Sequence, residues 1–167
     1  SDPAVRILEV AAYFRLLDRQ RVNDAARAVM VAYAMGADLD KVGALLGVTR
    51  LVLSPADPEN GVAAVMAADE DFRRRIVLAA EAFSVAGPSG AYIAHALSAD
   101  SDVLDVSALS PSPAVVDIYV LSRSGDGTAD QALIDAVDAA LSDQAVRPVA
   151  DRVTVQLNEF INYSKPR

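Results

Sequence analysis

Between Pro3 and Gly36 the sequence contains neither glycine nor proline, and this long stretch restricts the fold more than any other feature. Asp2 and Pro3 favour a helix start, because aspartate can accept hydrogen bonds from the free amides and proline fits the first turn. Gly36 favours a helix end. An unbroken helix would hold about 33 residues and be roughly 50 Å long at 1.5 Å per residue. The polar run DRQRVND at residues 18–24 is the place where the stretch could divide into two helices.

The apolar residues of this stretch form two stripes at helical spacing. The first stripe consists of Val5, Leu8, Ala12 and Leu16, followed by Asn23, Ala26, Met30 and Tyr33. The second, flanking stripe consists of Ile7, Val10, Phe14 and Leu17. A helix with two apolar faces needs a partner on each, from its own chain or from another. Phe14 and Tyr33 are therefore candidates for packing or subunit contacts.

Three further segments before residue 100 have clear local patterns. Residues 36–50 (GADLDKVGALLGVTR) predict a short helix, and residues 53–61 (LSPADPENG) predict a loop because they are rich in proline, glycine, Asp and Asn. Residues 69–83 predict a second strong helix, and residues 91–97 a third after the break AGPSG. The apolar faces of these two helices supply further packing candidates, namely Phe72, Ile76, Ala79, Ala80 and Phe83 on the first and Tyr92 on the second.

After Asp102 the apolar period changes from helical to alternating. Residues 103–109 (VLDVSAL) and 115–121 (VVDIYVL) predict an antiparallel pair of strands. Thr128 and Gln131 have the spacing of a capping box, which predicts the start of another helix. The buried face of that helix is expected to contain Leu133, Val137, Ala140 and Leu141, widened by Ile134. Residues 152–163 predict a last strand.

These elements predict an α+β fold, with an N-terminal helical region followed by a ferredoxin-like α-β-β-α-β unit that lacks the usual first strand, or an α+β relative of it. We expect a helical region at residues 1–53, a linker loop at 54–68 and an α+β domain at 69–167.

Composition excludes several classes of site. The chain has 167 residues, no cysteine and one histidine, so disulfides, thiol nucleophiles, thiolate metal sites and multi-histidine metal sites are absent. No apolar run reaches the roughly 18–20 residues that span a bilayer, and no signal peptide is recognisable. From Ser1, followed by Asp and Pro with no Met, we expect that the chain begins inside a longer gene product.

The charge is acidic and unevenly distributed. The net charge is −8, and residues 1–53 hold seven Lys or Arg against six Asp or Glu, whereas residues 54–167 hold eight against seventeen. Nucleic acid and anionic membranes bind clustered positive charge, so we expect neither as a partner.

The sequence DEDFRRRI at residues 69–76 tests this expectation, because three adjacent arginines could bind phosphate. On a helix, however, each arginine lies four residues after an acid, which is the favourable orientation for ion pairs worth about 0.2–0.5 kcal/mol each. We therefore predict a charged face on a structural helix, with Arg74 as a candidate subunit contact. A specific protein contact is the alternative that remains open, and phosphate binding is disfavoured.

Three other motifs could be mistaken for functional sites. DSDVLD (100–105) lacks the glycine and distal glutamate of a calcium loop and predicts a helix-to-strand turn. SGDGT (124–128) lacks the lysine of a phosphate loop and predicts a turn before a helix. His95 could be a lone general base, but the sequence offers no orienting partner or nucleophile for it. We expect a core or partly buried histidine, no cofactor, no metal and no enzymatic activity.

Several segments together resemble one family, the baseplate J-like proteins of Mu-like contractile-tailed bacteriophages. They are residues 36–50, DEDFRRRI, AGPSGAYIAHALSAD (86–100), DVSALSPSPAVVDIYVLSRSGDGT (105–128) and VRPVADRVTVQ (146–156). No single segment is diagnostic, but their order and spacing fit the family over most of residues 36–156.

The resemblance implies a structural wedge subunit of a phage or tailocin baseplate, with no catalytic residues. Its expected partners are copies of itself and neighbouring baseplate proteins, and its expected location is the tail baseplate of the virion, with assembly in the host cytoplasm. Family members normally have a further, largely β region before this segment and a continuation after it, so the sequence is expected to be a fragment or a truncated form.

Two other functions stay open at this point. A ferredoxin-like unit could be a small-molecule-binding regulatory module, which predicts a concave pocket with convergent polar groups near the sheet. An enzyme would have to depend on His95 and scattered aspartates.

Overall fold

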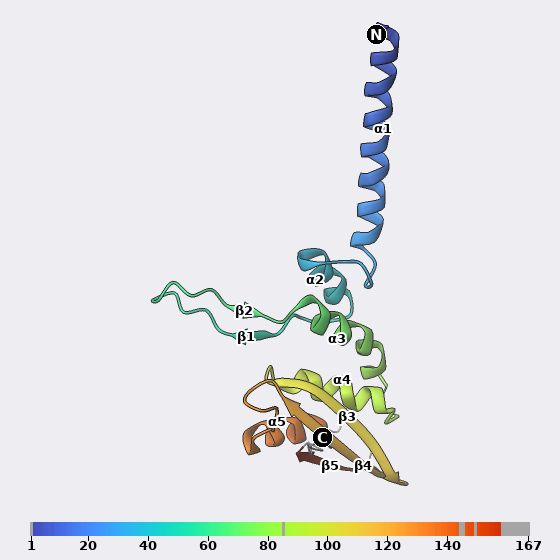
Figure 1. Ribbon diagram of the computed structural model, residues 1–167. Helices are drawn as coiled ribbons and strands as arrows, with labels where there is room; N and C mark the ends of the chain where they lie inside the picture. The colour runs from blue at the N-terminus through green and yellow to red at the C-terminus, as the bar shows by residue number, and fades with distance from the viewer. Residues whose placement is uncertain (1, 85, 144–145, 149, 158–167) are drawn as a thin grey trace, which may run out of the picture. The chain divides into compact units, whose positions relative to one another are not determined.

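The computed structural model describes residues 2–84, 86–143, 146–148 and 150–157. The chain divides into two compact units, Ser1–Thr49 and Arg50–Arg167. Figure 1 shows the order of the elements along the chain.

The first unit contains the long helix α1 (Pro3–Ala28) and the short helix α2 (Gly36–Leu45). Asp2 caps α1 as predicted, since its side chain accepts a hydrogen bond of 3.0 Å from the amide of Ala4. The polar run at residues 18–24 does not interrupt the helix. The expected continuation to Met35 is wrong, because α1 ends at Ala28 and turns follow.

The early end of α1 has a local cause. Val29 and Val31 are β-branched and lower the helix propensity of this segment. A tight turn replaces the helix there, in which the amides of Tyr33 and Ala34 both donate to the carbonyl of Met30. The guanidinium of Arg27 lies 5.8 Å from the centre of the Tyr33 ring and adds a cation–π contact to this turn.

The second unit begins with a short two-stranded arm that the sequence patterns do not predict. Strand β1 (Val52–Ser54) pairs antiparallel with β2 (Val65–Met66). Strand β2 lies inside the expected linker loop, whereas β1 starts at the end of the expected helical region and reaches the linker only at Ser54. At the tip, the carboxylate of Asp57 accepts hydrogen bonds from the amides of Glu59 and Asn60. The sequence does not predict these strands, because β1 has three residues and β2 has two, and proline and glycine lie between them.

In the rest of the second unit, helices α4 (Ser89–Ala99) and α5 (Gln131–Leu141) pack on a three-stranded sheet, and helix α3 (Asp69–Ala82) packs on α4. The helices α3 and α4 precede strands β3 (Val103–Ser112) and β4 (Val115–Ser122), and helix α5 precedes β5 (Arg152–Leu157). The sheet order is β3-β4-β5, with β3 antiparallel and β5 parallel to β4. The predicted α-β-β-α-β order is thus present. Because no earlier strand intervenes, β5 pairs directly with β4, and the expected strand residues 158–163 lie outside the described residues.

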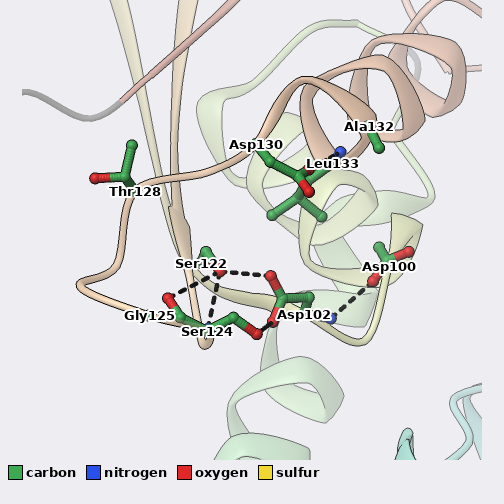
Figure 2. A pocket seen from close by; sticks show the side chains of 9 residues that line it. All are labelled: Asp100, Asp102, Ser122, Ser124, Gly125, Thr128, Asp130, Ala132 and Leu133. Carbon is green, nitrogen blue, oxygen red and sulfur yellow. Dashed lines mark hydrogen bonds between the residues drawn. The ribbon is translucent and has the colours of Figure 1, made fainter.

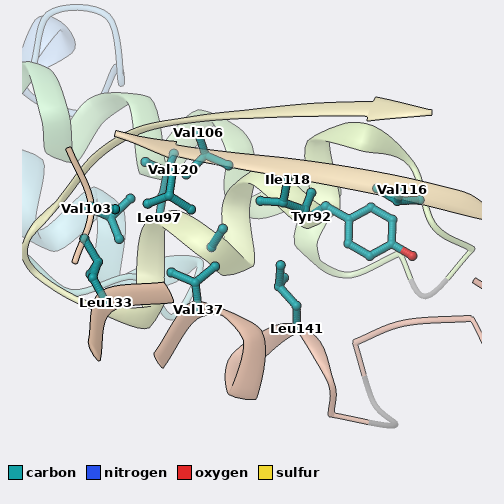
Figure 3. Packing of buried hydrophobic residues seen from close by; sticks show 12 residues of the cluster. Tyr92, Leu97, Val103, Val106, Val116, Ile118, Val120, Leu133, Val137 and Leu141 are labelled. Atoms are coloured by element: carbon teal, nitrogen blue, oxygen red, sulfur yellow. The ribbon is translucent and has the colours of Figure 1, made fainter. Parts of the chain in front are cut away.

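The core of this unit lies between the sheet and helices α4 and α5 (Figure 3). In β4 the side chains alternate, so Val116, Ile118 and Val120 are buried while their neighbours are half-buried on the other face. Helix α5 contributes Leu133, Val137 and Leu141 as predicted, and the partly buried Ile134 packs beside them.

One helix start differs from the prediction. The N-cap of α5 is Asp130, whose side chain accepts a hydrogen bond of 2.8 Å from the amide of Leu133. Thr128 lies two residues earlier and belongs to the preceding turn, where its amide donates to Asp126. The predicted capping box of Thr128 and Gln131 is therefore wrong, because a carboxylate nearer the helix satisfies its free amides.

Candidate assembly surface

Helix α1 is exposed on all sides. None of its 26 residues is buried, and Ile7 and Leu8 are 70% and 69% exposed. Seven large apolar side chains of its first half are exposed, namely Val5, Ile7, Leu8, Val10, Tyr13, Phe14 and Leu16. Contiguous exposed apolar surface on a protein chain indicates a surface that another molecule covers.

The second predicted stripe was expected to flank the first, but the two stripes lie on opposite sides of α1. At 3.6 residues per turn each residue advances about 100°, which places the stripe of Val5, Leu8 and Leu16 roughly opposite the stripe of Ile7, Val10 and Phe14. A helix that is apolar on opposite sides is normally enclosed by partners. The second half of α1 is different, because residues 18–27 are mostly charged or polar.

The seven packing and contact candidates separate into two groups. Phe72, Ile76 and Tyr92 are each 1% exposed and belong to the interior of the second unit. Phe14, Tyr33 and Phe83 are exposed, and the side chain of Arg74 is 44% exposed. Only the second group is available for contacts with other molecules, so the candidates do not form one site.

Phe83 departs from the prediction that it lies on the docked face of its helix. It follows the last residue of α3 and is 72% exposed, although its spacing from Phe72 and Ile76 is helical. Burial on this face ends at Ala79. Periodicity gives the direction of a side chain, but it does not show where the covering element ends.

The charged residues of α3 form ion pairs with distant parts of the chain. Arg73 pairs with Glu70 at 3.0 Å, three residues away, and Arg74 pairs with Asp105 of β3 instead of the predicted Glu70. Asp71 accepts a bond of 2.7 Å from Arg123, which follows β4. The pairs of Arg74 and Asp71 connect α3 to the sheet region, and Arg75 donates to the hydroxyl of Ser98 on α4 at 3.2 Å. The three arginines thus contact partners inside the unit, and phosphate binding has no support in their geometry.

Arg50 is a structural residue that the sequence patterns missed. Its guanidinium pairs with Asp69 at 2.7 Å, donates to the carbonyl of Ala67 at 2.7 Å and lies 4.7 Å from the centre of the Phe72 ring. A planar guanidinium suits this combination of ion pair and stacking. No sequence signal points to it, because its main partners lie 17 to 22 positions away.

Tyr92 and Asp151 form a second pair that spacing could not reveal. The Tyr92 hydroxyl donates to the Asp151 carboxylate at 2.6 Å across 59 positions of sequence. Burial raises the pKa of Tyr92 well above its usual range, and the hydrogen bond to Asp151 raises it further. The pair connects α4 to the residue just before β5.

A hollow between the end of β4 and the start of α5 is lined by three aspartates, and it has a volume of about 500 Å³ (Figure 2). The carboxylate of Asp102 accepts hydrogen bonds from the hydroxyls of Ser122 and Ser124. Asp100 accepts from the amide of Asp102, and Asp130 caps α5. The acids thus stabilise the turns around them. Among the described residues, no group of His, Asp or Glu side chains has a geometry that could hold a metal ion.

His95 is partly buried on α4, and its Nε2 atom lies 3.2 Å from the carbonyl oxygen of Ala82. This contact connects α4 to the end of α3 and gives the Nε2 atom of His95 a hydrogen-bond partner.

In the described part of the chain, no helix is both long and apolar enough to cross a membrane.

Comparisons with known proteins find matches along most of the chain. Residues 1–57 match the model of the baseplate J-like N-terminal domain, and residues 84–157 match that of the baseplate J-like central domain. Baseplate protein J of Escherichia phage P2 is 52% identical over 165 residues, which cover 98% of this chain and 55% of that protein. The chain therefore spans about half the length of this relative.

Proposed function

Because the chain belongs to the baseplate J-like family, we propose that it is a structural subunit of a phage or prophage contractile-tail baseplate. It acts there by self-association and by contact with neighbouring baseplate proteins. Its location is the tail baseplate of the virion, and it assembles in the host cytoplasm. The name of the phage P2 relative and the two domain matches support this role.

The observation that carries the proposal is the exposed apolar half of α1. Burying a large apolar side chain contributes about 1.5–3 kcal/mol, so one stripe of three such residues contributes roughly 5–9 kcal/mol. Association costs an estimated 4–15 kcal/mol in lost freedom of motion, so one covered stripe is marginal. Covering both stripes roughly doubles the gain, which favours an assembly in which α1 has a partner on each side.

The proposal includes no catalytic step. His95 contacts a backbone carbonyl, and the acids that line the hollow beside α5 hold turns and a helix cap. A general base needs a nucleophile within reach, and the carbonyl oxygen that contacts His95 is not one.

Sedimentation velocity of the purified chain at increasing concentration tests the self-association. The wild-type chain should show a mass above that of the monomer, and Ile7→Asp/Phe14→Asp should shift it strongly toward the monomer, because a charge at the centre of a stripe opposes burial. Val77→Asp is the matched control: Val77 is 64% exposed on α3, so its substitution should leave the mass unchanged. A wild-type chain that stays monomeric at every concentration contradicts the proposal.

Contact with neighbouring baseplate proteins has a separate test. The genes that flank a tail gene usually encode other tail proteins, so the products of the flanking genes can be co-expressed with this chain. We expect at least one of these proteins to co-purify with the wild-type chain. The same protein should not co-purify with the variant Ile7→Asp/Phe14→Asp. Co-purification of none of them contradicts this part of the proposal.

A further inference from the structure

The second half of α1 presents a basic surface. Residues 15–27 contain four arginines and two aspartates. Side chains of this half line a shallow hollow on the helix, formed by Arg15, Asp18, Arg19, Val22 and Asn23. Arg15, Arg19 and Val22 are spaced i, i+4 and i+7 and share one face, so the exposed Val22 follows two cations along it. Asp18 also lines the hollow and lies 3.9 Å from Arg21, so the hollow holds two arginines and one aspartate and has a net positive charge.

Helix α5 presents an acidic surface, opposite in charge to the hollow of α1. The segment 126–143 contains five aspartates and neither lysine nor arginine. On the outer face of α5, the small residues Ala132 and Ala139 are exposed beside the exposed Asp135 and Asp138. Asp135 accepts a bond from the neutral Gln131, and no described lysine or arginine forms an ion pair with Asp135 or Asp138.

We propose that the basic hollow of α1 receives the outer face of α5 from a second copy of the chain. This inference rests on the self-association proposed above and names the surfaces that meet. Arg15 and Arg19 lie about one turn apart, as Asp135 and Asp138 do, so two ion pairs form when the helices lie antiparallel. The alanines of α5 let the helices approach closely, and Val22 packs against them.

Charge complementarity selects a second copy as the occupant. In this contact, the acidic α5 of the second copy meets α1 of the first copy, which has a net positive charge. The aspartates of α5 repel one another, and the arginines of α1 reduce this repulsion. The contact joins two different surfaces, so it is heterologous: each copy keeps one surface free for the next copy, which generates a closed ring or an open chain. The apolar stripes are a separate surface of α1.

A charge-swap experiment on the full chain tests the inference. Arg15→Glu/Arg19→Glu and, separately, Asp135→Arg/Asp138→Arg should each weaken association roughly tenfold or more, because two attractions become two repulsions. An equimolar mixture of the two variants should recover association, because every α1–α5 contact between unlike chains again joins opposite charges. Lys41→Glu/Arg152→Glu is the matched control: both side chains are exposed outside α1 and α5, so it changes the net charge equally and should have a much smaller effect.

Each outcome has a definite meaning. All substituted side chains are exposed, so circular dichroism should show unchanged helix content, and the neutral variant Arg15→Gln/Arg19→Gln should give a smaller loss in the same direction. A mixture that associates no better than either variant alone overturns the inference. If the wild-type chain associates and the charge variants behave like the wild type, the inference fails while the proposed self-association stands. If the wild-type chain is a monomer under all conditions, both fail.

Discussion

At the scale of single residues, Phe72 shows how the charged segment of α3 combines two tasks. Its ring is buried and lies under the guanidinium of Arg50, while the nearby Arg74 pairs with Asp105 on the sheet. The apolar spacing of Phe72 and Ile76 predicted their burial correctly. The spacing of the acids and arginines predicted local pairs, but Arg74 and Asp71 instead pair with residues that only the folded chain brings near.

Replacement of Phe72 tests its role in packing. Phe72→Ala should lower the free energy of unfolding by roughly 3–5 kcal/mol, because it removes a buried ring and leaves a cavity. Urea denaturation followed by circular dichroism measures this. Val77→Ala on the exposed side of α3 is the control and should change stability little, as should Arg74→Ala, whose ion pair is solvent-exposed. An unchanged midpoint for Phe72→Ala would contradict the assigned packing.

Tyr92 predicts a loss of stability at alkaline pH. Its pKa is raised in the folded state by burial and by Asp151, so the folded chain holds this proton more tightly than the unfolded chain does. The contribution is complete below the ordinary tyrosine pKa of about 10, and it decreases as pH rises above that value. Denaturation between pH 8 and about 11.5 should therefore show stability decreasing above pH ~10. Tyr92→Phe should show a shallower decrease, and equal slopes would refute the assignment.

At the scale of elements, local signals predicted the helices better than their ends. The sequence predicted the apolar faces of α3 and α5 and the alternation of β4, because each pattern repeats over several residues. In β3 a shift of register after Val103 interrupts the alternation that the sequence predicted. The end of α1, the cap of α5 and the exposure of Phe83 depend on a few residues or on where a neighbour ends, and these predictions were wrong. The β1–β2 arm was not predicted, because two or three residues are too few to show the alternation of apolar and polar residues that marks a strand.

The cap of α5 can be tested directly. Asp130→Ala should destabilise the chain by about 0.5–2 kcal/mol, because the amide of Leu133 loses its hydrogen-bond acceptor. Thr128→Ala should cost less, since the Thr128 side chain does not cap the helix. Thermal denaturation of the two variants compares them, and a larger loss for Thr128→Ala would restore the capping box that the sequence predicted.

At the scale of the whole molecule, the two units differ in what they bury. The second unit has an apolar core between its sheet and helices, whereas α1 of the first unit buries none of its residues. The sequence predicted that α1 needs partners on both sides, because its two stripes can be read from spacing alone. It could not identify those partners, since a stripe of leucine, valine and phenylalanine fits many apolar surfaces.

The central claim is that α1 is covered when copies of the chain assemble, and hydrogen exchange of its backbone amides tests this most directly. Exchange of residues 5–17 should slow as the protein concentration rises, while amides in the core strand β4 keep a constant rate. Ile7→Asp/Phe14→Asp should remove this dependence on concentration. Exchange in residues 5–17 that is equally fast in dilute and concentrated solutions of the wild-type chain would contradict the claim.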